Sequence, residues 1–203
     1  MLKLILNKKY NPLFESDARY FIITGGRGSG KSFAATVFLT LLTMTKGVRI
    51  LFTRYTMTSA HLSIIPEFLE KIGLLGFDEV FSINKAEVLN TSNQSDILFR
   101  GIRTSAGNQT ASLKSLQGIS CFVLDEAEEL IDENIFDTID LSIREKGIQN
   151  RVILILNPVT KEHWIYDRFF ESKGVEGGFN GIRGNVCYIH STYLDNKDNL
   201  STS

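Results

Sequence analysis

The chain of 203 residues is long enough for one domain of generous size, and 43% of its residues are hydrophobic, enough for a buried core. Its formal net charge of −1 excludes a global basic field for nucleic acid, although one face can still carry a local basic patch. The two cysteines and three histidines lie too far apart in sequence to form a local zinc cluster. No apolar run approaches the roughly 18 residues that span a bilayer, and the N-terminus lacks the order of a signal peptide. We therefore expect a soluble, intracellular protein with no membrane contact.

The first regular pattern follows an approach segment, residues 1–19, in which Asn11-Pro12 predicts a turn. An apolar, β-prone run begins at Tyr20 and enters a glycine-rich turn, after which residues 33–45 have helical character. The turn matches the spacing G-x-x-x-x-G-K-S/T of a phosphate-binding P-loop, with Gly25, Gly30, Lys31 and Ser32 at the specified positions. Because a strand precedes the turn and a helix follows it, we predict a binding site for a nucleoside triphosphate.

Each residue type in this loop has a physical reason. Glycines let backbone N–H groups turn inward around an anion at a helix N-terminus. Lys31 supplies a positive charge for the β- and γ-phosphates, and the Ser32 hydroxyl supplies an oxygen ligand for Mg²⁺. The predicted nucleotide-binding residues are Gly25, Gly26, Arg27, Gly28, Ser29, Gly30, Lys31, Ser32 and Phe33. In the preceding segment, Tyr10 and Phe14 are either contacts of the nucleotide base or ordinary core residues.

The next stretch predicts a second buried strand, a helix and three short strands. Gly47 ends the first helix, and residues 48–53 form the strand. The apolar face of the following helix is predicted to consist of Leu62, Ile65, Leu69 and Ile72. Three further strand candidates are residues 80–83, 87–90 and 96–99, which we interpret as an antiparallel excursion in or beside a parallel sheet.

A polar, glycine- and serine-rich loop occupies residues 101–118 and carries Arg103 and Lys114. One interpretation is a solvated loop. The other is a moving element that reports the nucleotide state or touches a polyanion, because long loops without regular structure often have a function.

An acidic pair ends the next buried strand. The apolar run of residues 120–124 leads directly into Asp125 and Glu126, at the end of a strand where ligands bind in open α/β sheets. We predict that Asp125 holds Mg²⁺ and that Glu126 orients and deprotonates the attacking water. Glu128 and Glu129 are interpreted as acids that the macrodipole favours at a helix N-terminus.

The last third of the chain predicts a helix, a buried strand, a short helix and a final strand. The first helix has isoleucines at four-residue intervals, Ile131, Ile135, Ile139 and Ile143, and the strand covers residues 151–156. Asn157 follows this strand and either senses the γ-phosphate or the attacking water, or simply begins a turn. The remaining predicted segments are a short helix over residues 164–170, a glycine-rich linker over 174–184, a strand over 185–190 and a polar tail over 194–203.

Several of these stretches, taken in order, resemble the ATPase domain of tailed-phage terminase large subunits, the motors that package DNA into proheads. The stretches are residues 25–32, 51–54, 113–118, 125–130, 155–158 with His163-Trp164, and 191–196. The resemblance implies an α/β P-loop NTPase fold of the additional-strand type, with a mainly parallel sheet between helices and a short antiparallel excursion. It also implies an ATPase domain over residues 20–193, followed by a linker to a nuclease domain outside this sequence, so we expect ATPase activity without nuclease activity.

The resemblance also implies roles for individual residues. The implied catalytic residues are Glu126, Arg27, Lys31 and Asn157, and the implied metal ligands are Ser32 and Asp125. Arg27 would act as an arginine finger within its own subunit and offset charge in the transition state. Asn157 would couple hydrolysis to movement of a neighbouring subdomain. Lys114 and Arg103 would contact an adjacent subunit or DNA.

The function implied by the resemblance is hydrolysis of Mg²⁺-bound ATP that drives double-stranded DNA into a viral prohead in the host cytoplasm. Implied partners are other copies of the chain in a ring on a portal protein and the terminase small subunit. Two alternatives stay open at this point: a helicase-like or recombination ATPase that acts on nucleic acid, and a nucleotide-binding switch that does not hydrolyse.

Overall fold

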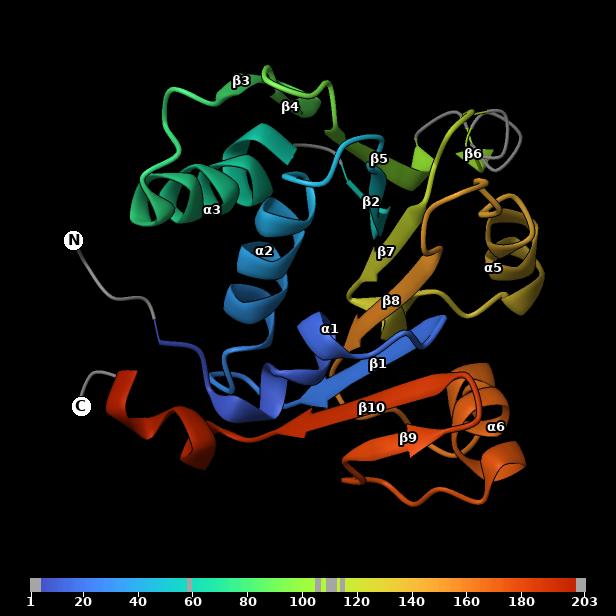
Figure 1. The fold of residues 1–203 in the computed structure, drawn as a ribbon. Helices are drawn as coiled ribbons and strands as arrows, with labels where there is room; N and C mark the ends of the chain where they lie inside the picture. Colours follow the sequence, from blue (N-terminus) through green and yellow to red (C-terminus); the bar gives the residue numbers. More distant parts are fainter. Residues whose placement is uncertain (1–4, 58–59, 105–106, 109–112, 114–115, 200–203) are drawn as a thin grey trace.

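The computed structural model describes residues 5–57, 60–104, 107–108, 113 and 116–199, which form a β-sheet with helices on both faces (Figure 1). The strands are β1 Tyr20–Gly25, β2 Arg49–Thr56, β3 Phe81–Asn84, β4 Glu87–Asn90, β5 Asp96–Thr104, β6 Gly107–Asn108, β7 Cys121–Asp125, β8 Arg151–Leu156, β9 Gly181–Arg183 and β10 Val186–Ser191. The α-helices are α1 Pro12–Glu15, α2 Lys31–Leu42, α3 Ala60–Leu75, α5 Glu133–Asp140 and α6 Trp164–Phe169. Short 3-10 helices are η1 Lys8–Tyr10, η2 Ala127–Glu129, η3 Glu171–Lys173 and η4 Tyr193–Asn199.

The sheet has a parallel centre and antiparallel edges. Its strand order is β3-β4-β5-β2-β7-β8-β1-β10-β9, and β6 pairs with β5. The strands from β5 to β10 in this order pair in parallel, whereas β3, β4, β6 and β9 pair antiparallel with their neighbours. Strand β8 lies between β1 and β7, so it is the additional strand that the predicted fold class requires.

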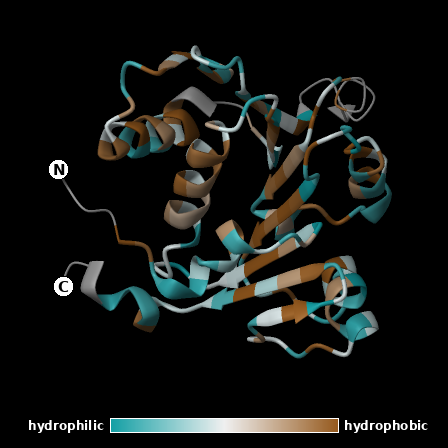
Figure 2. Cartoon of the chain, in the orientation of Figure 1, coloured by the Kyte–Doolittle hydropathy of each residue, from teal (hydrophilic) through white to brown (hydrophobic). Residues whose placement is uncertain are grey.

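Both faces of the sheet are buried, as expected for a parallel sheet. Successive residues of one strand alternate between two cores: Ile23 packs with α2 and α3, whereas Ile22 packs with α5 and α6. Figure 2 shows the hydrophobic residues concentrated in the central strands, with hydrophilic residues on the outer surfaces of the helices. No helix in the described ranges combines the length and the apolar surface that a bilayer crossing requires.

The predicted apolar face of α3 is right for Ile65 and Ile72, which are buried, and wrong for Leu62 and Leu69. Leu62 is 71% exposed, Leu69 is 46% exposed, and the face that packs on the sheet is Ile64, Ile65, Phe68 and Ile72. Phe68 accounts for this difference, because its ring lies 5.8 Å from the ring of Phe52 and 5.2 Å from that of Phe99, centroid to centroid. The aromatic cluster on the sheet buries more apolar area than the two leucines could.

Other predicted elements differ from the structure in pairing or extent. The antiparallel excursion consists of β3 and β4 only, because β5 pairs in parallel with β2 and so belongs to the main sheet. Ile131 is 82% exposed and precedes α5, which begins at Glu133. Asp132 caps this helix, because its side chain accepts a hydrogen bond from the backbone N–H of Asn134. The predicted linker contains the edge strand β9, and the predicted tail contains η4.

A buried carboxylate joins α5 to the start of β1. Asp140 is 5% exposed and accepts hydrogen bonds from Arg19 Nη2 at 2.6 Å and Tyr20 Oη at 2.7 Å. We expect Asp140→Ala to lower the free energy of unfolding by about 1–3 kcal/mol, because the partly buried donors Arg19 and Tyr20 lose their common acceptor. Urea unfolding followed by circular dichroism measures this loss.

Asp137 provides the matched control on the same helix. It contacts Arg168 Nη1 at 2.5 Å, but its side chain is 44% exposed. Asp137→Ala should therefore cost only about 0–1 kcal/mol. Equal losses for the two variants would contradict the role assigned to Asp140.

Candidate functional site

The loop between β1 and α2 has the backbone geometry of an anion cradle. Gly30 has a φ of 84° and ends the loop, directly before α2 begins at Lys31. A side chain at Gly25 would place its Cβ 2.1 Å from the backbone oxygen of Ser191, so β1 can approach β10 this closely only with glycine there. The N-terminus of the 12-residue helix α2 thus faces the loop, where its free N–H groups and dipole favour an anion.

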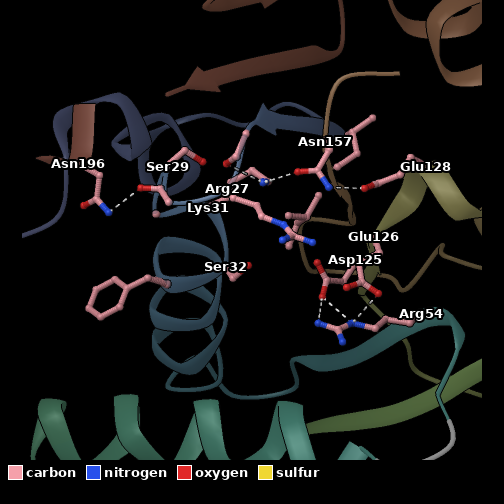
Figure 3. A pocket seen from close by; sticks show the side chains of 16 residues that line it. Arg27, Ser29, Lys31, Ser32, Arg54, Asp125, Glu126, Glu128, Asn157 and Asn196 are labelled. Atoms are coloured by element: carbon pink, nitrogen blue, oxygen red, sulfur yellow. Dashed lines mark hydrogen bonds and ion pairs between the residues drawn. The ribbon is translucent and has the colours of Figure 1, made fainter. Parts of the chain in front are cut away.

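A pocket of about 440 Å³ opens beside this loop, at the carboxyl ends of β1, β7 and β8 (Figure 3). Its lining residues are Gly26, Arg27, Gly28, Ser29, Gly30, Lys31, Ser32, Phe33, Arg54, Asp125, Glu126, Glu128, Ile155, Leu156, Asn157 and Asn196. The fold therefore brings the predicted loop residues, the acidic pair and Asn157 into one cavity. Gly25 ends β1 at the base of the loop.

A chain of hydrogen bonds links the loop to residues that follow β8 and β7. Lys31 Nζ donates to Gly26 O at 3.3 Å and to Asn157 Oδ1 at 3.2 Å, and Asn157 Nδ2 donates to Glu128 Oε1 at 2.6 Å. Burial lowers the pKa of Lys31, and the nearby charges of Glu128 and Asp125 partly oppose this effect. Asn157 thus contacts the loop lysine instead of only beginning a turn. The interpretation of Glu128 as a simple N-terminal acid is incomplete, because its side chain lies in the pocket.

The acidic pair extends from the end of β7. Asp125 is 5% exposed, and Glu126 has a left-handed backbone with a φ of 53°. Such a conformation is uncommon for a residue other than glycine, and strained positions of this kind concentrate at functional sites. Burial raises the pKa of Glu126, with the charge of Arg54 opposing the shift.

Sequence reasoning assigned no role to Arg54, which contacts both acids. Its Nε and Nη2 donate to Asp125 Oδ2 at 2.8 and 2.6 Å, and its Nε lies 3.6 Å from Glu126 Oε2. Burial opposes the guanidinium charge, but the carboxylates of Asp125, Glu126 and Glu67 together outweigh burial and raise the pKa of Arg54. The sequence signals were the position of Arg54 after a predicted buried strand and its place in the stretch 51–54 that resembles the terminase family.

Two segments from opposite ends of the chain support the loop. Tyr10 is buried, donates to Ser29 O at 3.0 Å, and shares a hydrogen bond with Ser191 Oγ. Asn196, in η4, donates to Gly28 O at 2.9 Å and lines the pocket. The polar composition of residues 194–203 gave no sign of this contact.

Neither Tyr10 nor Phe14 belongs to the lining of the pocket. Tyr10 is a core residue, and the half-exposed ring of Phe14 packs edge-on against Phe38, with 5.1 Å between centroids. The structure therefore supports the core interpretation for Tyr10.

Apart from Lys31, three basic residues with predicted roles differ in their relation to the pocket. Arg27 is exposed, and Figure 3 shows its side chain extending from the loop into the pocket toward the acidic pair. Arg103 is exposed on β5 and does not line the pocket. Lys114 lies outside the described residues.

The profile of the phage terminase large subunit matches residues 17–202. The chain belongs to the phage terminase large-subunit family. A terminase large subunit from Bacillus phage SPP1 is 24% identical over 215 residues, which cover 97% of this chain and 48% of that protein. This terminase chain thus spans about half the length of its curated relative.

Solved structures share the terminase fold. The large terminase of a thermophilic bacteriophage has a TM-score of 0.75 at 12% identity, covering 98% of this chain and 48% of that one. The ATPase domain of the Thermus phage P74-26 large terminase has a TM-score of 0.68 at 17% identity, covering 96% and 84%. The N-terminal domain of the DNA packaging ATPase from bacteriophage phi29 has a TM-score of 0.69 at 14% identity, covering 91% and 96%. The terminase chain therefore has the additional-strand P-loop fold predicted from its sequence.

Proposed function

We propose that this chain hydrolyses ATP and that hydrolysis powers the movement of double-stranded DNA into a viral prohead. The observation that carries the proposal is the convergence of Lys31, Asp125 and Glu126 in one pocket of a terminase-family chain. The large terminase of the thermophilic bacteriophage, a structural neighbour, has been solved in complex with ADP and with ATP-gamma-S.

The pocket has the groups that triphosphate binding requires. The loop N–H groups would hold the phosphates, and Lys31 would exchange Asn157 for the β- and γ-phosphate oxygens. The Ser32 hydroxyl and the Asp125 carboxylate are hard oxygen donors in the same pocket, so this donor set fits Mg²⁺. When bound, the ion neutralises charge on the phosphates and the leaving group.

The hydrolysis step follows from the positions of the acidic residue and the loop arginine. Glu126 would accept a proton as a water oxygen bonds to the γ-phosphorus, and the bond from that phosphorus to the β,γ-bridging oxygen would break to release ADP. Arg27 would offset the charge on the transferred phosphoryl group. Asn157 hydrogen-bonds to both Lys31 and Glu128. Loss of its bond to Lys31 when ATP binds would therefore alter its contact with Glu128.

Partners and location are proposed from the family. We propose duplex DNA, a portal protein, the terminase small subunit and further copies of the chain in a ring as partners, acting in the host cytoplasm. The structural neighbours include the "Phi-28 gp11 DNA packaging Motor", with a TM-score of 0.57 at 15% identity. We also propose residues 20–193 as the ATPase domain, with the flanking segments supporting its phosphate loop.

Phosphate release from ATP, with and without duplex DNA, tests the proposal. Displacement of a triplex-forming strand from the duplex tests translocation, and release of one duplex strand tests the helicase alternative. Separation of the two duplex strands by this chain would overturn the proposal that it moves intact duplex DNA. Nucleotide binding with no phosphate release would favour the switch alternative. Incubation with plasmid DNA checks the expectation that this chain does not cut DNA.

Lys31→Ala is expected to weaken ATP binding about 10- to 150-fold, because a charge-assisted hydrogen bond contributes about 1.5–3 kcal/mol. Calorimetric titration with a slowly hydrolysed ATP analogue measures the affinity. Lys46→Ala is the control, since Lys46 is an exposed lysine beyond the other end of α2. Unchanged affinity in Lys31→Ala would contradict its assigned role.

A further inference from the structure

Arg54 lies where β2 passes the end of β7, and Figure 3 shows its side chain directed at the acidic pair. Two of its donors, Nε and Nη2, converge on a single oxygen of Asp125, Oδ2. Its side chain is 22% exposed and that of Asp125 is 7% exposed, so water competes little for this ion pair. Arg54 also lines the pocket.

The other carboxylate oxygen of Asp125 remains available. In the part of the chain that the structure describes, no hydrogen bond reaches Oδ1, yet Oδ1 is not among the buried polar atoms without a partner. It is therefore accessible, and Asp125 lines the pocket. The guanidinium thus binds Oδ2 of the carboxylate and leaves Oδ1 for a ligand in the pocket.

A second arginine on β2 shows the difference from a purely structural pair. Arg49 binds both oxygens of Asp96, with Nε 3.0 Å from Oδ1 and 3.2 Å from Oδ2, and Nη2 2.9 Å from Oδ2. Neither residue lines the pocket. Arg49 occupies the carboxylate completely, whereas Arg54 engages only half of the Asp125 carboxylate.

We propose that Arg54 is a positioning residue that presents Asp125 Oδ1 to the Mg²⁺ of bound ATP. This inference rests on the proposed ATPase function. Outer-shell partners of this kind orient ligating carboxylates, and their loss typically reduces metal affinity or activity about 10- to 100-fold. The guanidinium also balances the adjacent negative charges of Asp125 and Glu126. A lysine would supply the same charge but not the fixed geometry of two donors.

The test is the gain in nucleotide affinity that Mg²⁺ provides. Calorimetry measures the Kd of ATP-gamma-S with Mg²⁺ and with EDTA, in the wild type, Arg54→Gln, Arg54→Lys and Asp125→Asn. We expect Arg54→Gln to reduce the Mg²⁺-dependent gain about 10- to 100-fold while the affinity in EDTA changes little. Arg54→Lys keeps the positive charge but should not restore the wild-type gain. In the Asp125→Asn background, Arg54→Gln should cause no further loss, because the two residues act through one contact.

Arg49→Gln is the matched control: it should lower the melting temperature but keep the Mg²⁺-dependent gain. An unchanged gain in both Arg54 variants would overturn the proposal. A larger gain would also overturn it, because Arg54 would then compete with the metal for Asp125. If Arg49→Gln lost the gain as well, the effect would be a general consequence of destabilisation and the positioning role would be wrong. Absence of ATP-gamma-S binding by the wild type would instead overturn the proposed function itself.

Discussion

Glu126→Gln is expected to slow ATP hydrolysis by about 10²–10⁴-fold, because the amide keeps the shape of the side chain but cannot accept the proton of the attacking water. ATP affinity should change little, since Glu126 is assigned to the chemical step and not to phosphate binding. The raised pKa of Glu126, caused first by burial, is consistent with a group adapted to accept a proton.

Single-turnover phosphate release and nucleotide titration measure the two effects separately. Glu129→Gln is the matched control, because Glu129 is the last residue of the short helix η2 that Glu126 precedes, is exposed and does not line the pocket. A wild-type rate in Glu126→Gln would show that another group accepts the proton. An equal decrease in Glu129→Gln would point to general loss of charge near the site.

Arg27→Ala is expected to reduce kcat about 10³-fold, the lower end of the range for an arginine finger. Its effect on ATP affinity should be much smaller, because the contact strengthens as charge develops in the transition state. Arg27 is exposed and extends from the loop into the pocket, where its guanidinium can contact the γ-phosphate of bound ATP (Figure 3).

Steady-state turnover measures kcat, and titration with a slowly hydrolysed ATP analogue measures the Kd, so the two contributions are separated. Arg27→Lys keeps the charge and tests whether the planar guanidinium is needed. Arg144→Ala is a control for loss of an exposed arginine outside the pocket. Equal losses in kcat and affinity would make Arg27 a residue that binds the ground state.

Local patterns were sufficient to predict the central strands and most of the pocket. Each of β1, β7 and β8 contains a short apolar run. Asp125 and Asn157 come directly after the runs in β7 and β8, and Lys31 follows β1 after the glycine-rich loop. Because parallel strands end at the same edge of a sheet, residues that follow different strands meet there. Lys31, Asp125 and Asn157 were therefore predictable as neighbours.

Contacts between distant segments were not predictable in this way. Arg54 reaches Asp125 across 71 residues, and Asn196 reaches Gly28 across 168 residues. Neither pair has a local spacing rule, since each depends on how the whole sheet is ordered. Strand β5 shows the same limit, because the short predicted strand of residues 96–99 does not reveal that β5 pairs in parallel with β2 and antiparallel with β4.

The rotation of α3 could not be read from spacing alone. The predicted face and the observed face both have apolar residues at helical intervals. The choice depends on the partner surface, where Phe68 packs against both Phe52 and Phe99, which also contact each other.

The two supports of the phosphate loop affect how shortened versions of this chain should be judged. Tyr10 holds the loop from near the start of the chain and Asn196 from near residue 203, and Lys9 and Asp195 join the two supports through a 2.9 Å ion pair. A cloning boundary placed inside either segment would remove a contact that supports the phosphate loop, while Lys31, Ser32 and the acidic pair stayed in the sequence. Weak ATP binding by such a truncated protein would reflect the chosen boundary and not the catalytic capacity of the pocket.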